Sequence, residues 1–419
     1  AQQSQAKHEE SKLGLVRELC SFDRRLSGTD AERRAANAMA TRLRRQGRRA
    51  EIESIYVHPQ APLVWALYCV LVSVGSVLSI SQPEAGFALV LVATTAFYLD
   101  LNTSRHFLRL LFFRRASQNV VSRGRNADAT TKLILAAHLD TARTGMIFGK
   151  RATSASRRIS GLLPFPHTRL LFWSAAVLLP ILGARTAGVD TDGLAVLQVI
   201  PTLILIVSAF LLVDWRLGSV VPGANDNASG VAVTLSLAER LEAEPTGNLD
   251  VWVVLTGGEE CGMEGMRSFA RSHKDELDPY KTIVLAIDSV GAGDVRWVTA
   301  EGMTISFDMD LRVDQLCEAI AEADAEDENR FRASALRHGY ATDALAARVA
   351  GLRASAITTL EPGAIVPANH HTPADMPDSL DPEAMDRAED FTLELIRALD
   401  RDLGRTERRP QREKSASAA

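Results

Sequence analysis

The chain has 419 residues and a formal net charge of -5 at pH 7, with 46% hydrophobic and 24% charged residues. This length suits one large domain or two smaller ones, and the lack of a basic excess excludes a protein that holds nucleic acid on a broadly positive surface. The cysteines lie far apart without CxxC spacing; they are Cys20, Cys69, Cys261 and Cys317. They predict no disulfide framework and are compatible with a reducing compartment.

The first predicted elements are a helix and an apolar hairpin. The helix is "SGTDAERRAANAMATRLRRQG", which begins at the capping residues Ser27 and Thr29 and stops at Gly47. The run 63–81 carries no charge and is long enough to cross about 30 Å of hydrocarbon as a helix. A shorter apolar run, 85–99, follows after one short loop. The two runs predict a transmembrane hairpin; the alternative is core helices of a soluble protein.

A second hairpin is predicted further along the chain. The strand pattern "TKLILAA" leads into His138, and Asp140 follows two residues later. The apolar runs 170–184 and 193–213 come next, again separated by a short loop and free of charge. This hairpin lies between His138 and Asp226, so we expect it either to restrict access to a site at these residues to molecules near the bilayer or to form a lid.

Basic residues flank the inner ends of both hairpins: Arg44, Arg45, Arg48, Arg49, Arg105, Arg109, Arg114, Arg115, Lys150, Arg151, Arg157, Arg158 and Arg169. The outer loops, "SQPE" and "RTAGVDTDG", hold one arginine between them. The positive-inside rule then places both termini and the rest of the chain in the cytoplasm. We therefore expect an integral membrane protein with four spans, and the segment 105–115 at headgroup level.

The remaining chain alternates strands and helices. "LDVWVVLTGGEE", "YKTIVLAIDSVGAG" and "ASAITTLEPG" are strand patterns, separated by amphipathic helices. This predicts an α/β fold, a three-layer sandwich with a central mixed, mostly parallel sheet. Residues 1–57, 116–149 and 219–404 would form that domain, interrupted by the hairpin segments 58–115 and 150–218. The polar tail 405–419 is expected to be disordered.

Polar residues cluster where the predicted strands end, and the carboxyl ends of such strands form the ligand crevice. The candidates are His138, Asp140, Asp226, Glu259, Glu260, Asp288, His370 and His371. Imidazole and carboxylate donors without thiolates suit Zn²⁺, with Mn²⁺ or Co²⁺ as alternative occupants. The donors are too many for one open catalytic zinc and fit two metals about 3.5–4 Å apart. Asp140 is placed to accept the second N–H of His138 and fix its tautomer.

Five segments resemble the metal-site blocks of the di-zinc aminopeptidase family, which includes aminopeptidase Y, bacterial leucyl aminopeptidases and glutamate carboxypeptidase II. They are "AAHLDT", "PGANDNASG", "TGGEECGMEGMRSF", "VLAIDSVG" and "HTPADMPDSLDP", in the order of that family. The resemblance implies that His138 and Asp288 hold one zinc, that Glu260 and His371 hold the other, that Asp226 bridges them, and that Glu259 is the general base. His371 is preferred to His370 because His371, Thr372 and Asp375 match the family's pattern.

The implied activity is hydrolysis of peptides with a free N-terminus, by water activated between two metals. One departure is Thr342-Asp343-Ala344, where the family has Ser-Asp-His, which puts family-like substrate contacts of that loop in doubt. One alternative is a glutaminyl cyclase, which shares the fold with a single zinc; the intact His138 favours two metals. Another is a non-catalytic membrane scaffold or binding module, which the intact glutamates disfavour. A transporter is disfavoured because the apolar runs hold no ionisable residue.

Overall fold

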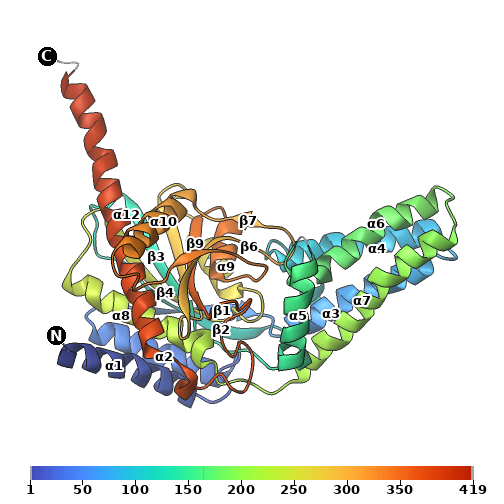
Figure 1. The fold of residues 1–419 in the computed structure, drawn as a ribbon, viewed down its shortest axis with the longest axis horizontal. Helices are drawn as coiled ribbons and strands as arrows, with labels where there is room; N and C mark the ends of the chain where they lie inside the picture. Colours follow the sequence, from blue (N-terminus) through green and yellow to red (C-terminus); the bar gives the residue numbers. More distant parts are fainter. Residues whose placement is uncertain (1, 164, 417–419) are drawn as a thin grey trace.

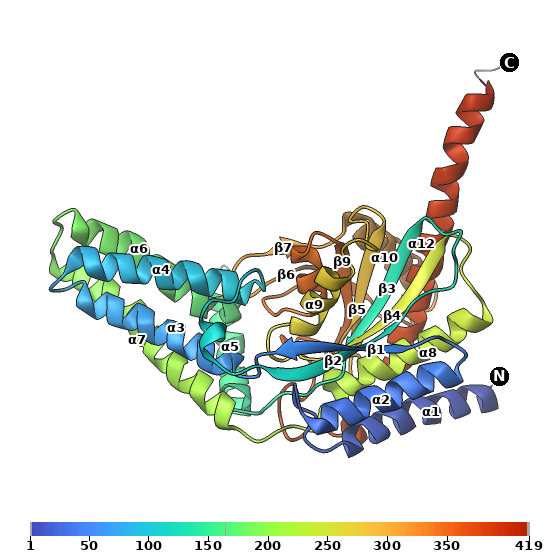
Figure 2. The ribbon, with the colours of Figure 1, turned by 180° about the vertical axis from the view of Figure 1, so that it is seen from behind.

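The computed structural model describes residues 2–163 and 165–416. It shows a sheet domain, to which the first and last described helices belong, and a long bundle of apolar helices that projects from one side of it (Figures 1 and 2). The predicted segregation of the sequence into an α/β part and apolar hairpins is therefore also a separation in space.

Nine strands of the described chain form one mixed sheet in the order β1-β2-β4-β3-β5-β9-β6-β7, with β8 paired to β6. Their bounds are β1 Glu51–Val57, β2 Arg115–Ser122, β3 Thr131–His138, β4 Leu249–Thr256, β5 Thr282–Ile287, β6 Asp294–Glu301, β7 Phe307–Asp308, β8 Ser334–Arg337 and β9 Arg353–Leu360. The central strands β4, β3, β5 and β9 are parallel. Antiparallel pairs lie on both sides of this centre, at β1-β2-β4 and at β9-β6. The sheet is mixed, as predicted, and its parallel strands are concentrated in the middle.

Helices cover both faces of the sheet and complete the predicted three layers. On one face lie α1 Gln2–Ser21, α2 Asp30–Arg45, α8 Gly230–Ala243, α10 Leu311–Glu326 and α12 Pro382–Ala416; on the other lie α9 Glu264–Ser272 and α11 Asp343–Val349. Alternate residues of β3 serve the two cores, because successive side chains of a strand point to opposite faces. Leu133 packs in the first core with Phe391, and Ile134 packs in the second with Phe269.

The apolar runs form the helices α3 Ala61–Leu78, α4 Pro83–Leu101, α6 Leu170–Thr186 and α7 Asp192–Leu217. Within the described chain, four helical segments are long and apolar enough to cross a membrane. Helix α3 packs on α4 and α7, and α6 packs on the same two helices. The outer faces stay apolar: Val77, Ile206 and Phe210 are 60%, 50% and 63% exposed. A bundle that is apolar both inside and outside is typical of helices surrounded by lipid.

Both hairpins are insertions whose ends meet in the sheet domain. The first occupies the connection between β1 and β2, whose paired residues Val57 and Arg115 lie opposite each other. The second leaves after Asp140 and returns before Asp226, and its two ends pair through the Thr144 N–H and the Ser219 carbonyl at 2.9 Å. The short segments between helices are η1 Leu108–Leu111, η2 Met146–Phe148, α5 Lys150–Leu162, η3 His167–Arg169, η4 Ala224–Ser229 and η5 Pro377–Ser379.

Two expectations about flanking segments need correction. Arg109 was expected at headgroup level with the rest of 105–115, but it is fully buried and paired with Asp100 and Glu264. The tail 405–419 was expected to be disordered, but α12 continues to Ala416, and residues 417–419 lie outside the described residues.

Candidate metal centre

The predicted site residues lie together at the carboxyl ends of the central strands. His138 is the last residue of β3, Asp288 directly follows β5, and Glu259 and Glu260 follow β4 after a Gly-Gly turn. Asp140 also follows β3, Asp226 lies in η4, and His370 and His371 lie in the loop between β9 and α12. The register of β3 and β4 pairs His138 with Thr256, so the residues that follow both strands emerge at the same edge.

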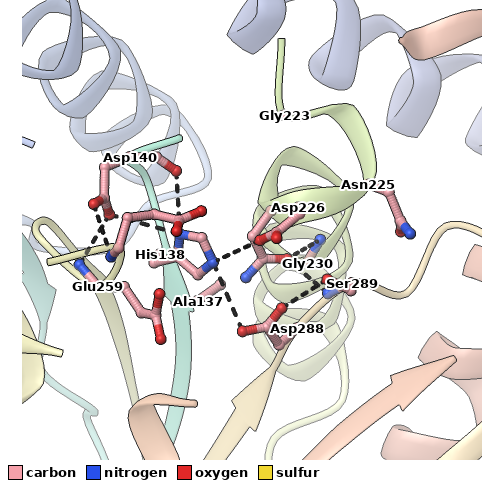
Figure 3. A network of polar contacts seen from close by, with 12 residues as sticks. Ala137, His138, Asp140, Gly223, Asn225, Asp226, Gly230, Glu259, Asp288 and Ser289 are labelled. Carbon is pink, nitrogen blue, oxygen red and sulfur yellow. Dashed lines mark hydrogen bonds and ion pairs between the residues drawn. The ribbon is translucent and has the colours of Figure 1, made fainter. Parts of the chain in front are cut away.

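His138 faces two carboxylates with one ring nitrogen. Its Nε2 lies 3.1 Å from Asp226 Oδ1 and 3.7 Å from Asp288 Oδ2, and its Nδ1 lies 3.1 Å from the carbonyl oxygen of Asp140 (Figure 3). Donation from Nδ1 to that carbonyl leaves the lone pair of Nε2 pointing at carboxylate oxygens. This arrangement requires a proton or a cation between them. Ligand atoms about 2.0–2.2 Å from one zinc ion would be about 3–3.5 Å apart, so the observed spacing fits a metal.

His371 repeats the arrangement on the other side of Asp226. Its Nε2 lies 3.3 Å from Asp226 Oδ2 and 3.2 Å from Glu260 Oε2. Asp226 thus directs one oxygen to the His138 group and the other to the His371 group. His371 has φ 52°, which non-glycine residues rarely adopt, and such backbone conformations concentrate at functional sites.

His370 is more closely involved than the sequence suggested. Its Nδ1 lies 3.1 Å from Asp226 Oδ2, and its ring stacks on that of His371 with centroids 3.9 Å apart. Asp226, His370 and His371 form one group whose atoms are close enough to hold a metal ion; His138, Asp226 and Asp288 form another. His371 also contacts Glu260, the other residue predicted to hold the same metal, and therefore fits the predicted ligand better than His370 does.

The electrostatics of the site also fit cations. Burial raises the pKa of Glu259 well above its usual value, and the neighbouring Glu260 and Asp288 raise it further despite the opposing effect of His138. Burial likewise raises the pKa of Asp288 to about 7. Burial would raise the pKa of Asp226 too, but hydrogen bonds from the surrounding imidazoles hold it well below its usual value. Such a density of buried carboxylates is costly unless positive charge is present.

Asp140 lies where predicted, but its carboxylate has a different main contact. The carbonyl oxygen of Asp140 is nearer to His138 Nδ1, whereas carboxylate Oδ1 lies 3.6 Å away. The carboxylate accepts the backbone N–H groups of Glu259 and Glu260, each at 3.1 Å, and the hydroxyl of Ser27 at 2.5 Å. Asp140 therefore joins the end of β3 to the turn that carries both glutamates.

Sequence reasoning missed two further sets of residues. Asp375, noted only as part of a motif, accepts the backbone N–H groups of Asn225 at 2.7 Å and Asp226 at 3.2 Å, and so holds η4 in place. The cavity of about 160 Å³ at the site is lined by Trp65 of α3 and Trp215 of α7 together with the candidate ligands. Tryptophan at the end of an apolar helix is usual at a membrane interface, so nothing in the sequence marked these two as part of the site.

Comparison with known proteins agrees with this geometry. Residues 209–396 match the model of peptidase family M28. The predicted family resemblance is confirmed. The match includes Asp226, Glu259, Glu260, Asp288 and His371, whereas His138 and Asp140 precede it. No curated protein sequence matches the chain.

Solved structures share the fold of this chain. A glutaminyl cyclase from Bacteroides thetaiotaomicron aligns with a TM-score of 0.52 at 12% identity, covering 93% of this chain and 97% of the other. A Zn-dependent exopeptidase from Parabacteroides distasonis aligns with a TM-score of 0.51 at 13% identity, covering 93% and 97%. An aminopeptidase from Aneurinibacillus sp. aligns with a TM-score of 0.52 at 13% identity, covering 93% of each chain. At these identities the likeness shows the fold alone.

Proposed function

We propose that this protein is a membrane-anchored, zinc-dependent exopeptidase that removes residues from the free N-terminus of peptides. The observation that carries the proposal is the position of Asp226, which directs one carboxylate oxygen to His138 and the other to His371. This geometry supports a pair of metals with a shared carboxylate, and the M28 match supports peptide hydrolysis.

The proposed roles follow the donor geometry. His138 and Asp288 would hold one Zn²⁺, Glu260 and His371 the other, and Asp226 both; Mn²⁺ or Co²⁺ are alternative occupants. When bound, the metals supply Lewis-acid polarisation of the scissile carbonyl and a lower pKa for the attacking water. Glu259 would take a proton from the attacking water and pass it to the leaving amine. Asp140 positions Glu259 and Glu260 through their backbone N–H groups.

The test combines metal analysis with hydrolysis assays on protein purified in detergent. We expect bound zinc at two per chain, release of N-terminal residues from a peptide library, and loss of activity on removal of zinc by a chelator. Glu259→Gln should retain the metal and lower kcat by about 10²–10⁴-fold, the usual contribution of a general base. Glu361→Gln, at an exposed position, is the matched control and should keep full activity. Hydrolysis of no peptide by the zinc-loaded protein would contradict the proposal.

A second candidate function is glutaminyl cyclisation, because glutaminyl cyclases are among the structures that share this fold. A cyclase releases ammonia from an N-terminal glutamine, whereas an exopeptidase releases a free amino acid. Incubation with a glutamine-led peptide therefore separates the two activities. The donors on both sides of Asp226 favour the peptidase, since they exceed what a single zinc ion requires.

We further propose that α3, α4, α6 and α7 span a membrane with the M28 domain on the cytoplasmic side. The apolar outer surface of the bundle and the basic flanks of its inner ends support this arrangement. In intact cells, an impermeant maleimide should label Ser81→Cys at the far tip of the bundle and spare Glu361→Cys in the M28 domain. Labelling of Glu361→Cys alone would reverse the orientation.

A further inference from the structure

A second cavity lies beside the metal centre, between the M28 domain and the second hairpin. Its volume is about 290 Å³, and most of its wall is apolar. The residues contributed by the second insertion include Phe148 of η2, Leu171 of α6, and Leu212 and Trp215 of α7. We call this cavity the side chamber. Figure 1 shows α5, which contributes Thr153 and Ser156 to the wall, standing at the junction of the two parts.

The side chamber adjoins the cavity of the metal centre. The two share Trp65, Trp215, Tyr340, His370 and His371 among their lining residues. An occupant of the side chamber would therefore lie against residues that also line the metal centre, including His371.

The shared wall is aromatic and rests directly on a candidate metal ligand. The ring of Phe148 lies 4.6 Å from that of His371 and 5.3 Å from that of Trp215, which in turn lies 6.0 Å from Trp65. The insertions thus form part of the wall of the site in addition to holding the domain at the bilayer. Aromatic side chains in such clusters offer large apolar contact area to a ligand.

The uncharged lining of the side chamber restricts the kind of ligand that it can bind. Among the described residues that line it, none is Asp, Glu, Lys or Arg, and the polar groups are confined to hydroxyls and imidazoles such as Ser156, Thr168 and His167. A charged ligand would lose its hydration there without gaining a partner, whereas an apolar one would gain by leaving water.

We propose that the side chamber binds the apolar residues near the N-terminus of a peptide, and so makes the protein selective for peptides that are themselves drawn from the bilayer. This inference rests on the proposed peptidase function. Leu171 and Leu212 belong to helices apolar enough to span a membrane, so the chamber lies where a lipid-embedded peptide end would meet the M28 domain. The site then receives its substrate along the second hairpin rather than from water.

The test fills the chamber and measures peptide binding directly. Ser156→Trp projects a large ring into it from α5, a helix with no buried residue among those described, so the fold should tolerate the change. Ser154→Trp, at an exposed position of the same helix outside the lining, is the matched control. All variants carry Glu259→Gln, hold zinc and sit in lipid nanodiscs. Calorimetry gives Kd for Leu-Leu-Val-Lys-Lys and for its polar counterpart Ser-Gly-Ser-Lys-Lys.

We expect Ser156→Trp to raise Kd for the apolar peptide at least tenfold and to change Kd for the polar one less than twofold, with no change in Ser154→Trp. Thr153→Trp, from the same wall, should reproduce the result. The proposal is overturned if the filling variants raise Kd equally for both peptides. It is also overturned if neither Ser156→Trp nor Thr153→Trp raises Kd for either peptide. Displacement of the apolar peptide by dodecylamine at equal concentration would assign the chamber to a lipid chain and also overturn it. If the selective Kd shift is found but protein with native Glu259 hydrolyses neither peptide, the result supports peptide binding in the side chamber and contradicts the proposed peptidase function.

Discussion

The inner ends of the two hairpins meet the sheet domain through different chemistry. The first hairpin is joined by buried charges to the turn that carries Glu259 and Glu260. The second is joined by aromatic contacts to His371 and by hydrogen bonds to backbone carbonyls of the sheet domain. Paired buried charges tolerate little change in geometry, because any misplacement leaves a charge without its partner. Apolar walls have no such constraint and leave room for a ligand, so the two junctions are suited to positioning and to binding respectively.

At the first junction a fully buried arginine connects both parts of the molecule. Arg109 Nη2 lies 2.9 Å from Asp100 of α4, and its Nη1 lies 3.0 Å from Glu264 at the start of α9. Its Nη1 also donates to the carbonyl oxygen of Cys261, the residue after Glu260. Trp65 of α3 donates its indole N–H to Asp100 at 2.9 Å. The position of the glutamate turn is therefore coupled to the inner end of the first hairpin.

At the second junction the acceptors are neutral. Arg169 Nε donates to the carbonyl oxygen of Gly302 at 3.0 Å, and the indole of Trp173 donates to that of Thr304 at 3.0 Å. Trp173 is 42% exposed, so its hydrogen bond is not enclosed by the protein. The contacts that approach the metal centre, from Phe148 and Trp215, are apolar.

The largest loss of folding stability is expected from Arg109→Ala. It removes the cation that is paired with the buried carboxylates of Asp100 and Glu264, and the loss of one partner from a buried ion pair costs about 3–5 kcal/mol. Thermal unfolding of the purified protein in detergent measures the loss. Arg105→Ala, at an exposed position four residues earlier, is the control and should stay within about 0.5 kcal/mol of the native protein.

Arg109→Lys sharpens this result. A lysine keeps the charge but lacks the planar fork that contacts both carboxylates and the Cys261 carbonyl together. Relative to Arg109→Ala, we expect Arg109→Lys to restore part of the free energy of unfolding and little of the catalytic activity. Recovery of full kcat by the lysine would mean that charge alone, rather than the coupled position of the turn, is what the site needs.

The second largest effect is expected from Trp65→Phe. The phenyl ring keeps most of the packing in the bundle but removes the hydrogen bond to Asp100, whose acceptor is a fully buried carboxylate. Hydrogen bonds to charged groups contribute about 1.5–3 kcal/mol, and the same thermal unfolding experiment should show a loss in that range. Because Trp65 also lines the cavity at the metal centre, KM should change as well.

The sequence revealed what depends on local pattern. Uninterrupted apolar runs predicted the helices of both hairpins, and polar residues after buried strands predicted which side chains gather at the sheet edge. It could not reveal the pairing of Arg109 with Glu264, because these residues are 155 positions apart and an arginine beside an apolar run is equally typical of a membrane surface. The same reason concealed Trp65 and Trp215. Their place in the wall of the site depends on how the hairpins dock, which no local pattern records.

The smallest effect is expected from Trp173→Phe, the same substitution at the other junction. It removes the hydrogen bond from the indole N–H of the half-exposed Trp173 to the neutral backbone carbonyl of Thr304, and such a bond contributes about 0.5–1.5 kcal/mol. The pair Trp65→Phe and Trp173→Phe therefore compares the two junctions at constant chemistry, with the acceptor as the main difference. A larger loss for Trp65 supports a charge-organised first junction, and a loss at least as large for Trp173 would remove that distinction. Because Trp173 lines neither the cavity of the metal centre nor the side chamber, the KM of the Trp173→Phe variant should equal that of the native protein.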